Sequence, residues 1–540
     1  MKTQIEMTAN ELGLNHDHLE FFGQDKAKVS LAALASPSAR GKVILVSAIT
    51  PTPAGEGKTT VSIGLAQGLR KASHRVALAL RQPSMGPVFG RKGTATGGGK
   101  STLMPADSIN LHFTGDFHAI TTAHLLLASA LDNSLHFKTT RLDAKKVLWK
   151  RVIDMNDRAL RNIRVGMSHA DPDGRASGFD ITAASEIMAI LCLTENYEDL
   201  RARLNRIVVG FTPDMQPVTA EEMRVTGAMM AVLRDALKPN LVRSIEGVPA
   251  FVHGGPFANI AHGCNSVLAT RMGMGHADYV VTEAGFGFDL GGEKFMDIKC
   301  RQSGLSPDAI VLVATVRALK FHGGVPLADL GNENPAAIER GLANLDAHLE
   351  SARFFGRPIV VAINQFAADL PDEHLIIERH CAEKKVACAV ANVFGEGGEG
   401  GIELAEQVVW ATQQSSPKLP FVYASDESVE KKIEKIAKVI YGADGVDFSE
   451  LAQERLELIR THGYQDLPIC MAKTHESLSD DPASRGRPRQ FRISVRDFEI
   501  ASGAGYLVAL TGKLLRMPAL PRVPGAERIR MDEFGTITGW

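Results

Sequence analysis

Residues 43–60 read Val-Ile-Leu-Val-Ser-Ala-Ile-Thr-Pro-Thr-Pro-Ala-Gly-Glu-Gly-Lys-Thr-Thr. The first seven are mostly apolar, which predicts a buried strand. A turn with two glycines follows, and Lys-Thr then opens a helical pattern with apolar residues at Val61, Leu65 and Leu69. A strand, a glycine turn and a helix in this order are typical of a loop that binds nucleotide phosphates. Its backbone N–H groups and the helix N-terminus face the anion.

The usual phosphate-binding pattern is G-x-x-x-x-G-K-[ST], and Thr52 stands here at its first position. An ordinary strand–helix turn rich in small residues is the alternative, but the surrounding strand and helix favour a nucleotide site. The predicted ATP-binding residues are Thr52, Pro53, Ala54, Gly55, Glu56, Gly57, Lys58, Thr59 and Thr60. Within this set, Lys58 can reach the β- and γ-phosphates, and the Thr59 hydroxyl can hold Mg²⁺.

The composition narrows the class of protein. The chain has 540 residues, enough for two to four domains, and its net charge of −2 argues against a broad nucleic-acid-binding surface. No apolar run approaches the ~18 residues that span a bilayer, and the N-terminus lacks the apolar stretch of a signal peptide. The six cysteines are far apart and form no C-x-x-C pair. We therefore expect a cytoplasmic protein with reduced thiols and without membrane or nucleic-acid partners.

Short apolar runs alternate with helical patterns along most of the chain, which predicts an α/β fold with a doubly wound, mainly parallel sheet. The predicted domains are a large nucleotide-binding domain at 1–350, an α/β domain at 351–420 and a C-terminal α/β domain at 421–540. The predicted strands are 42–49, 76–80, 206–210, 249–253, 278–282, 310–315, 358–363 and 386–390.

Polar and glycine-rich segments follow these strands, where the ligands of such sheets bind. Arg81 follows the second strand, and its guanidinium can grip a carboxylate or an acyl phosphate with two hydrogen bonds. His253 follows another strand, and residues 110–124 contain three histidines and Asp116. A metal site there is disfavoured by the unequal spacing; polar contacts to substrate or capping of a helix by Asp116 fit better.

Two aromatic residues, Phe366 and Phe394, each follow a predicted strand. Such a side chain usually packs in the core, but it can also stack on a flat heterocycle.

Together these segments resemble the formate–tetrahydrofolate ligase family. The resemblance rests on Val313-Ala-Thr-Val-Arg-Ala-Leu-Lys-Phe-His-Gly-Gly324, which is similar to one family signature almost letter for letter, and on residues 90–100, which are similar to a second. The segments 52–60, 81–90, 110–124, 253–265, 278–303 and 467–482 are also similar. The resemblance covers the chain from about residue 20 to its end.

The resemblance implies that formate attacks the γ-phosphate of MgATP to give formyl phosphate and ADP, and that N10 of tetrahydrofolate then attacks the formyl carbon. Lys58 and Thr59 would bind the ATP phosphates, and Arg81 with Gly97, Gly98 and Gly99 would bind formate or phosphate. Phe366 and Phe394 match the two aromatics that hold the pterin. The family also implies a homotetramer and a monovalent cation, K⁺ or NH₄⁺. His112, Asp116 and His253 are candidates for the base that accepts the N10 proton.

The sequence departs from the family pattern at several positions. Gln82 stands where glutamate is usual, and Phe394 stands where tryptophan is common, which retains an aromatic face but loses area. In the glycine-rich stretch the changed residues are Arg91, Thr94, Thr96 and Lys100. Because Lys58, Thr59 and Arg81 are all present, we expect activity to survive these changes.

Three other readings stay open at this point. One is a shorter type of P-loop ligase, of the dethiobiotin synthetase kind, which would lack residues 313–324. Another is a partner-switching P-loop ATPase, which has no need of Phe366 and Phe394. The last is a folate-binding protein that has lost catalysis. A requirement for both formate and tetrahydrofolate in ATP turnover separates the ligase from all three.

Overall fold

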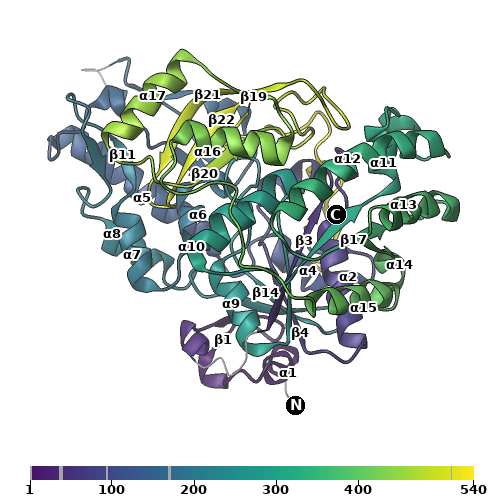
Figure 1. Cartoon of the computed structure of the whole chain (residues 1–540). Coiled ribbons are helices and arrows are strands. Elements are labelled where there is room, and N and C mark those ends of the chain that lie inside the picture. The colour runs from purple at the N-terminus through teal and green to yellow at the C-terminus, as the bar shows by residue number, and fades with distance from the viewer. Residues whose placement is uncertain (1–2, 36–40, 93–94, 168–171, 513, 540) are drawn as a thin grey trace.

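The computed structural model describes residues 3–35, 41–92, 95–167, 172–512 and 514–539. Their largest element is a twelve-stranded sheet whose main path runs β1-β2-β13-β14-β4-β15-β3-β16-β17-β18. The seven strands from β14 to β18 along this path pair in parallel, which confirms the predicted α/β fold. Figure 1 shows this sheet with helices packed around it.

The parallel strands lie close to the predicted ranges. They are β14 (Pro249–Val252), β4 (Val76–Leu80), β15 (Tyr279–Glu283), β3 (Lys42–Ala48), β16 (Ala309–Ala314), β17 (Ile359–Asn364) and β18 (Ala387–Ala391). The antiparallel edge contains β13 (Asn240–Ser244), β2 (Ala27–Val29) and β1 (Leu19–Phe21), with β6 (Ser101–Met104) and β5 (Gly97–Gly98) pairing off the path. The central strands are almost entirely buried because helices cover both of their faces.

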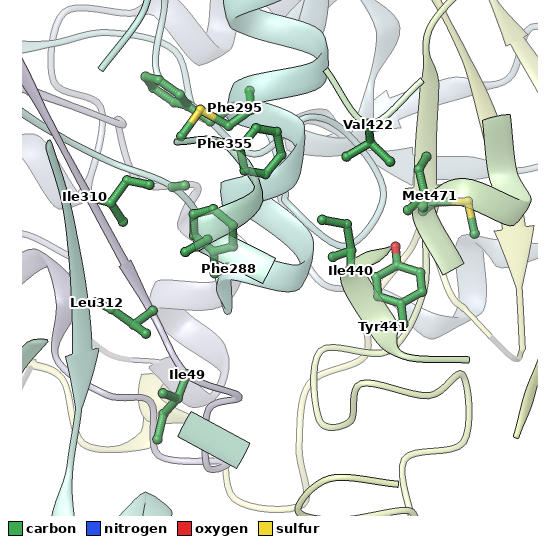
Figure 2. Packing of buried hydrophobic residues seen from close by; sticks show 14 of the residues in the cluster. Ile49, Phe288, Phe295, Ile310, Leu312, Phe355, Val422, Ile440, Tyr441 and Met471 are labelled. Atoms are coloured by element: carbon green, nitrogen blue, oxygen red, sulfur yellow. The ribbon is translucent and has the colours of Figure 1, made fainter. Parts of the chain in front are cut away.

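Successive side chains of the central strands point to opposite faces of the sheet, and each face packs in a separate hydrophobic core. On β3, Val43 and Leu45 pack toward a core formed with α12 (Pro335–Phe354), whereas Ile44 and Val46 pack against α2 (Lys58–Lys71) and α15 (Ile402–Thr412). Figure 2 shows the first of these cores, where Ile310 and Leu312 of β16 lie beside Phe288 and where the C-terminal region contributes Ile440, Tyr441 and Met471. The sheet therefore lies between two layers of helices, and one of these layers joins it to the end of the chain.

A second, four-stranded sheet forms the C-terminal region, which Figure 1 shows in yellow. Its strands are β19 (Gly445–Phe448), β21 (Arg492–Ala501), β22 (Tyr506–Thr511) and β20 (Ile469–Ala472), accompanied by α16 (Val429–Ile436) and α17 (Glu450–Thr461). One apolar cluster joins this sheet to four helices of the middle of the chain, namely α5 (Asp116–Phe137), α6 (Glu186–Leu193), α7 (Tyr197–Asn205) and α8 (Thr226–Leu233). Within the described residues, no helix is both long and apolar enough to cross a bilayer.

Two features differ from the sequence-based expectation. The predicted strand at 206–210 forms as β11 (Val208–Phe211), but it pairs with β12 (Pro217–Thr219) in a small sheet of its own, because a short turn brings these two segments together. The large sheet also continues without a break across residue 350, since β17 pairs in parallel with β16 and β18 pairs in parallel with β17. The division into domains at 1–350, 351–420 and 421–540 stays a prediction.

Candidate active site

The loop between β3 and α2 has the backbone shape that phosphate binding requires. Gly55 and Gly57 have φ angles of 80° and 71°, a left-handed conformation that favours glycine. A Cβ atom at Gly57 would lie only 2.4 Å from Nδ2 of Asn364. Gly57 is also the N-cap of α2 and places no side chain over the first turn. A helix N-terminus of this kind directs backbone N–H groups and the positive end of the helix dipole toward an anion.

Glu56 holds this loop together from inside. Its side chain is buried, and its Oε1 atom accepts hydrogen bonds from the N–H group of Thr52 at 2.6 Å and from the Thr52 hydroxyl at 2.8 Å. Its Oε2 atom accepts from the hydroxyl of Thr315, and its carbonyl accepts from Asn364 at 3.0 Å. Threonine in place of the first glycine thus has a structural role, because its hydroxyl anchors the Glu56 carboxylate. Any phosphate contact from Glu56 would have to come from its backbone.

Glu283 joins the nucleotide side of the site to Arg81. It is the last residue of β15 and is only 4% exposed. Its Oε2 atom accepts a hydrogen bond of 2.8 Å from the Thr59 hydroxyl, and its Oε1 atom lies 3.4 Å from Nη2 of Arg81. The strand order explains this arrangement, since β15 lies between β3, which precedes Thr59, and β4, which precedes Arg81. The sequence analysis assigned no role to Glu283, although an acidic residue at the end of a parallel strand could have indicated a ligand-binding residue.

The Arg81 side chain is closely packed at this edge of the sheet. Its Nη1 atom donates to the carbonyl of Pro256 at 3.3 Å, and its side chain is 17% exposed. A Cβ atom at Gly285 would lie 2.8 Å from Nη1 of Arg81. Glycine at position 285, just after β15, therefore leaves the space that the guanidinium occupies. The Nε atom is buried and has no partner among the described residues. The guanidinium therefore keeps hydrogen-bonding capacity for an anionic ligand.

The C-terminal region reaches the same edge through His475. Its ring stacks on Phe286, with ring centroids 4.2 Å apart. Burial lowers the pKa of His475 to about 4, and the positive charges of Lys473 and Lys58 act in the same direction. Lys473 itself forms a buried ion pair of 2.8 Å with Asp289. A neutral imidazole thus faces the region of Lys58, and sequence reasoning proposed no role for it.

The glycine-rich loop lies against Phe394. The N–H group of Lys100 donates to the carbonyl of Phe394 at 3.0 Å, and a Cβ atom at Gly99 would lie 2.2 Å from that same carbonyl. A Cβ atom at Gly98 would lie 3.0 Å from the Phe394 ring and 3.8 Å from the Thr60 hydroxyl. Gly97 has a φ of 91°. The loop therefore lies between the start of α2 and the Phe394 ring, which is 58% exposed.

Phe366 follows β17 just as Phe394 follows β18, and these two strands are parallel neighbours. The Phe366 ring is half-buried, and the Arg317 guanidinium lies over it, with Cζ 3.9 Å from the ring centroid. Its N–H group donates to Asp369 at 2.9 Å. Both predicted pterin-binding rings are thus presented at the edge of the sheet that carries the phosphate loop.

Two of the three predicted proton acceptors have their polar atoms engaged inside the protein. His253 is fully buried; its Nε2 atom donates to the carbonyl of Ala236 at 2.6 Å, so Nδ1 accepts from Ser266 at 2.7 Å. Burial lowers its pKa to about 4.

Asp116 is also buried, at the start of α5. It forms an ion pair with Lys28 and accepts a hydrogen bond of 2.7 Å from Asn240. His112, in contrast, is exposed.

The departures from the family pattern lie in different environments. Gln82 is 2% exposed, and its Oε1 atom has no partner among the described residues. Thr96 is buried and accepts a hydrogen bond of 3.2 Å from Asn110, whereas Lys100 is exposed. Thr94 and the side chain of Arg91 lie outside the described part of the chain.

Oxygen donors suited to Mg²⁺ are present beside the phosphate loop. The Thr59 hydroxyl and the Glu283 carboxylate are hard ligands of the kind that this ion takes together with nucleotide phosphates. These two residues therefore fit a metal–nucleotide complex.

The chain is similar to a known protein family. The model of that family, described as formate–tetrahydrofolate ligase, matches residues 1–540.

Proposed function

The chain belongs to the formate–tetrahydrofolate ligase family and is an enzyme that ligates formate to tetrahydrofolate, and we propose that it does so through formyl phosphate formed with ATP. The observation that carries this proposal is the bridge at Glu283. One carboxylate there contacts Thr59 of the nucleotide site and Arg81 of the predicted formate site. A path of two contacts thus connects the group that would bind ATP with the group that would bind its phosphoryl acceptor.

In the proposed first step, a formate oxygen forms a bond to the γ-phosphorus, and the bond from that phosphorus to the bridging oxygen of ADP breaks. Phosphoryl transfer depends mainly on positioning and on neutralising charge. Arg81 would hold the formate carboxylate, and Lys58 would neutralise the γ-phosphate. Mg²⁺, when bound by Thr59 and Glu283, would shield further phosphate charge.

In the proposed second step, N10 of tetrahydrofolate attacks the formyl carbon, and phosphate leaves. Phe366 and Phe394 would hold the pterin, and the loop of Gly97, Gly98 and Gly99 would contact the phosphate or formyl group. The amine must lose a proton. We assign no role in this transfer to His253 or Asp116, whose polar atoms are engaged within the fold. His112 is exposed and stays the candidate acceptor.

Further properties are proposed on family membership. They are a homotetramer and a requirement for K⁺ or NH₄⁺. A cytoplasmic location is also proposed, and it is supported by the six cysteines, all of which are free thiols.

The experiment that tests the proposed function measures ADP and 10-formyltetrahydrofolate. The purified protein is incubated with MgATP, K⁺, formate and tetrahydrofolate, and one component is omitted at a time. We expect continued ADP release to require both formate and tetrahydrofolate. Formate is the phosphoryl acceptor of the first step, and tetrahydrofolate must consume the formyl phosphate before another turnover can begin. Hydrolysis of ATP that is indifferent to both would contradict the proposal and favour a switching ATPase.

Phe394 offers a test of the folate site. We expect Phe394→Ala to raise the KM for tetrahydrofolate about tenfold, since a lost aromatic stack costs about 1.4 kcal/mol. Phe394→Trp is expected to lower that KM, because the larger ring covers more of the pterin. Steady-state kinetics check both, and the KM values for ATP and formate should stay unchanged. Phe137→Ala, at an exposed ring on α5, is the matched control; an equal effect there would count against the assignment.

A further inference from the structure

Arg317 links the phosphate loop to the aromatic ring predicted to hold the pterin. It lies in the first turn of α11 (Val316–His322), directly after β16. Its Nη2 atom donates to the carbonyl of Gly55, and its guanidinium lies over the Phe366 ring, with Cζ 3.9 Å from the centroid. One planar guanidinium therefore contacts both the loop that would bind ATP and the ring that would bind tetrahydrofolate.

Two further contacts tie the same elements together. The N-cap of α11, Thr315, donates its hydroxyl to Glu56 of the phosphate loop. Asn364, which ends β17 two residues before Phe366, donates to the carbonyl of Glu56 at 3.0 Å. The phosphate loop, the start of α11 and the segment after β17 thus form one connected unit at the sheet edge.

The charge of Arg317 is directed at this unit. Its Nε atom is buried and has no partner among the described residues. The guanidinium contacts the Gly55 carbonyl dipole and the electron-rich face of the Phe366 ring. Nucleotide phosphates bound to the loop would attract this guanidinium and restrict its motion.

We infer that Arg317 is a positioning residue that makes nucleotide and tetrahydrofolate bind cooperatively; this inference rests on the proposed function. A bound nucleotide orders the loop and holds Arg317 against Phe366, so the ring is already fixed when the pterin arrives. The pterin then loses less conformational freedom of the protein on binding, which gives positive coupling. Arg317 covers one face of Phe366, and in this proposal the pterin stacks on the opposite face.

The test measures the Kd of tetrahydrofolate by calorimetry under anaerobic conditions, with and without saturating magnesium and a non-hydrolysable ATP analogue. We expect the analogue to lower the Kd of the wild-type protein about fivefold or more. In Arg317→Met this ratio should fall to about one. Arg317→Lys keeps the charge but not the planar stack, and it should give an intermediate ratio. Because coupling is reciprocal, tetrahydrofolate must tighten analogue binding by the same factor.

Arg485→Met is the matched control. Arg485 lies over Phe321 of the same helix, with Cζ 4.2 Å from the ring centroid, so the variant also removes an arginine–phenylalanine stack from α11. It should keep the wild-type ratio. Thermal unfolding of each variant verifies that it is folded, and Arg317→Lys carries the test if the methionine variant does not fold. A wild-type ratio of one, or an unchanged ratio in Arg317→Met, would overturn the inference.

Phe366→Leu separates this inference from the proposed function. If that variant binds tetrahydrofolate with the wild-type Kd, the proposed folate site is wrong. If it binds more weakly while Arg317→Met keeps the coupling ratio, the folate site stands and the coupling role of Arg317 is refuted.

Discussion

Replacing Lys58 by methionine is expected to lower kcat by about a thousandfold. Methionine keeps an unbranched stem of similar length but removes the charge that would neutralise the γ-phosphate, and losing one such preorganised group typically costs 10²–10³ in kcat. The loop and the helix should persist, since the Glu56 hydrogen bonds and the two glycines hold the backbone. Formation of 10-formyltetrahydrofolate at saturating substrates measures the effect.

Lys71→Met is the control for this variant. Lys71 is the last residue of the same helix, α2, and its exposed side chain lies 3.3 Å from Glu399. An exposed ion pair of this kind contributes little, so activity should stay near that of the wild type. If Lys58→Met keeps more than about a tenth of the wild-type kcat, Lys58 does not stabilise the transferring phosphoryl group in the way proposed.

Replacing Arg81 by methionine is expected to lower kcat/KM for formate by at least a hundredfold, mainly through a higher KM. A guanidinium binds a carboxylate with two parallel hydrogen bonds, and methionine offers none. Arg81→Lys should recover only part of the loss, because an ammonium group cannot form the two-pronged contact. The KM for MgATP should change little in both variants. Initial rates over a range of formate concentrations distinguish the two constants.

The same pair of strands supplies a matched control at its other end. Arg75 precedes β4 and pairs with Asp278, which precedes β15, at 3.0 Å. Arg75→Met therefore removes an arginine from a carboxylate pair between the same two strands, but away from the site. We expect wild-type kinetics for it. An unchanged formate KM in Arg81→Met, with a folded protein by thermal unfolding, would show that formate binds elsewhere.

Much of the fold follows from local patterns. The apolar runs without alternation predicted the parallel strands within a residue or two, because strands covered on both faces must be apolar throughout. Gly55 and Gly57 were readable as loop residues, and the structure gives both the left-handed backbone that favours glycine. The sequence also predicts that Lys58 and Thr59 begin a helix. Such local predictions succeed because consecutive residues determine the geometry of a strand–loop–helix unit.

Local sequence patterns did not predict the contacts between residues that are far apart in the chain. A histidine after a strand indicated a site residue, yet the His253 ring turns inward to Ala236 and Ser266. By its place in the sequence Asp116 is a candidate helix cap or base, but Gly115 is the N-cap of α5 and the Asp116 carboxylate pairs with Lys28, far away in the chain. None of these three partners has a local signal, because each lies in another segment of the fold.

Local sequence patterns predict the kind of sheet, the phosphate loop and the residues at the strand ends. Which of those ends are neighbours depends on contacts between distant parts of the chain. The strand order puts β15 between β3 and β4, and this order places the Glu283 carboxylate between Thr59 and Arg81. Hydrophobic periodicity indicates which residues are buried, but it does not specify which of the buried strands are neighbours. The order is selected by packing between distant segments, and the chemistry of the site depends on that order.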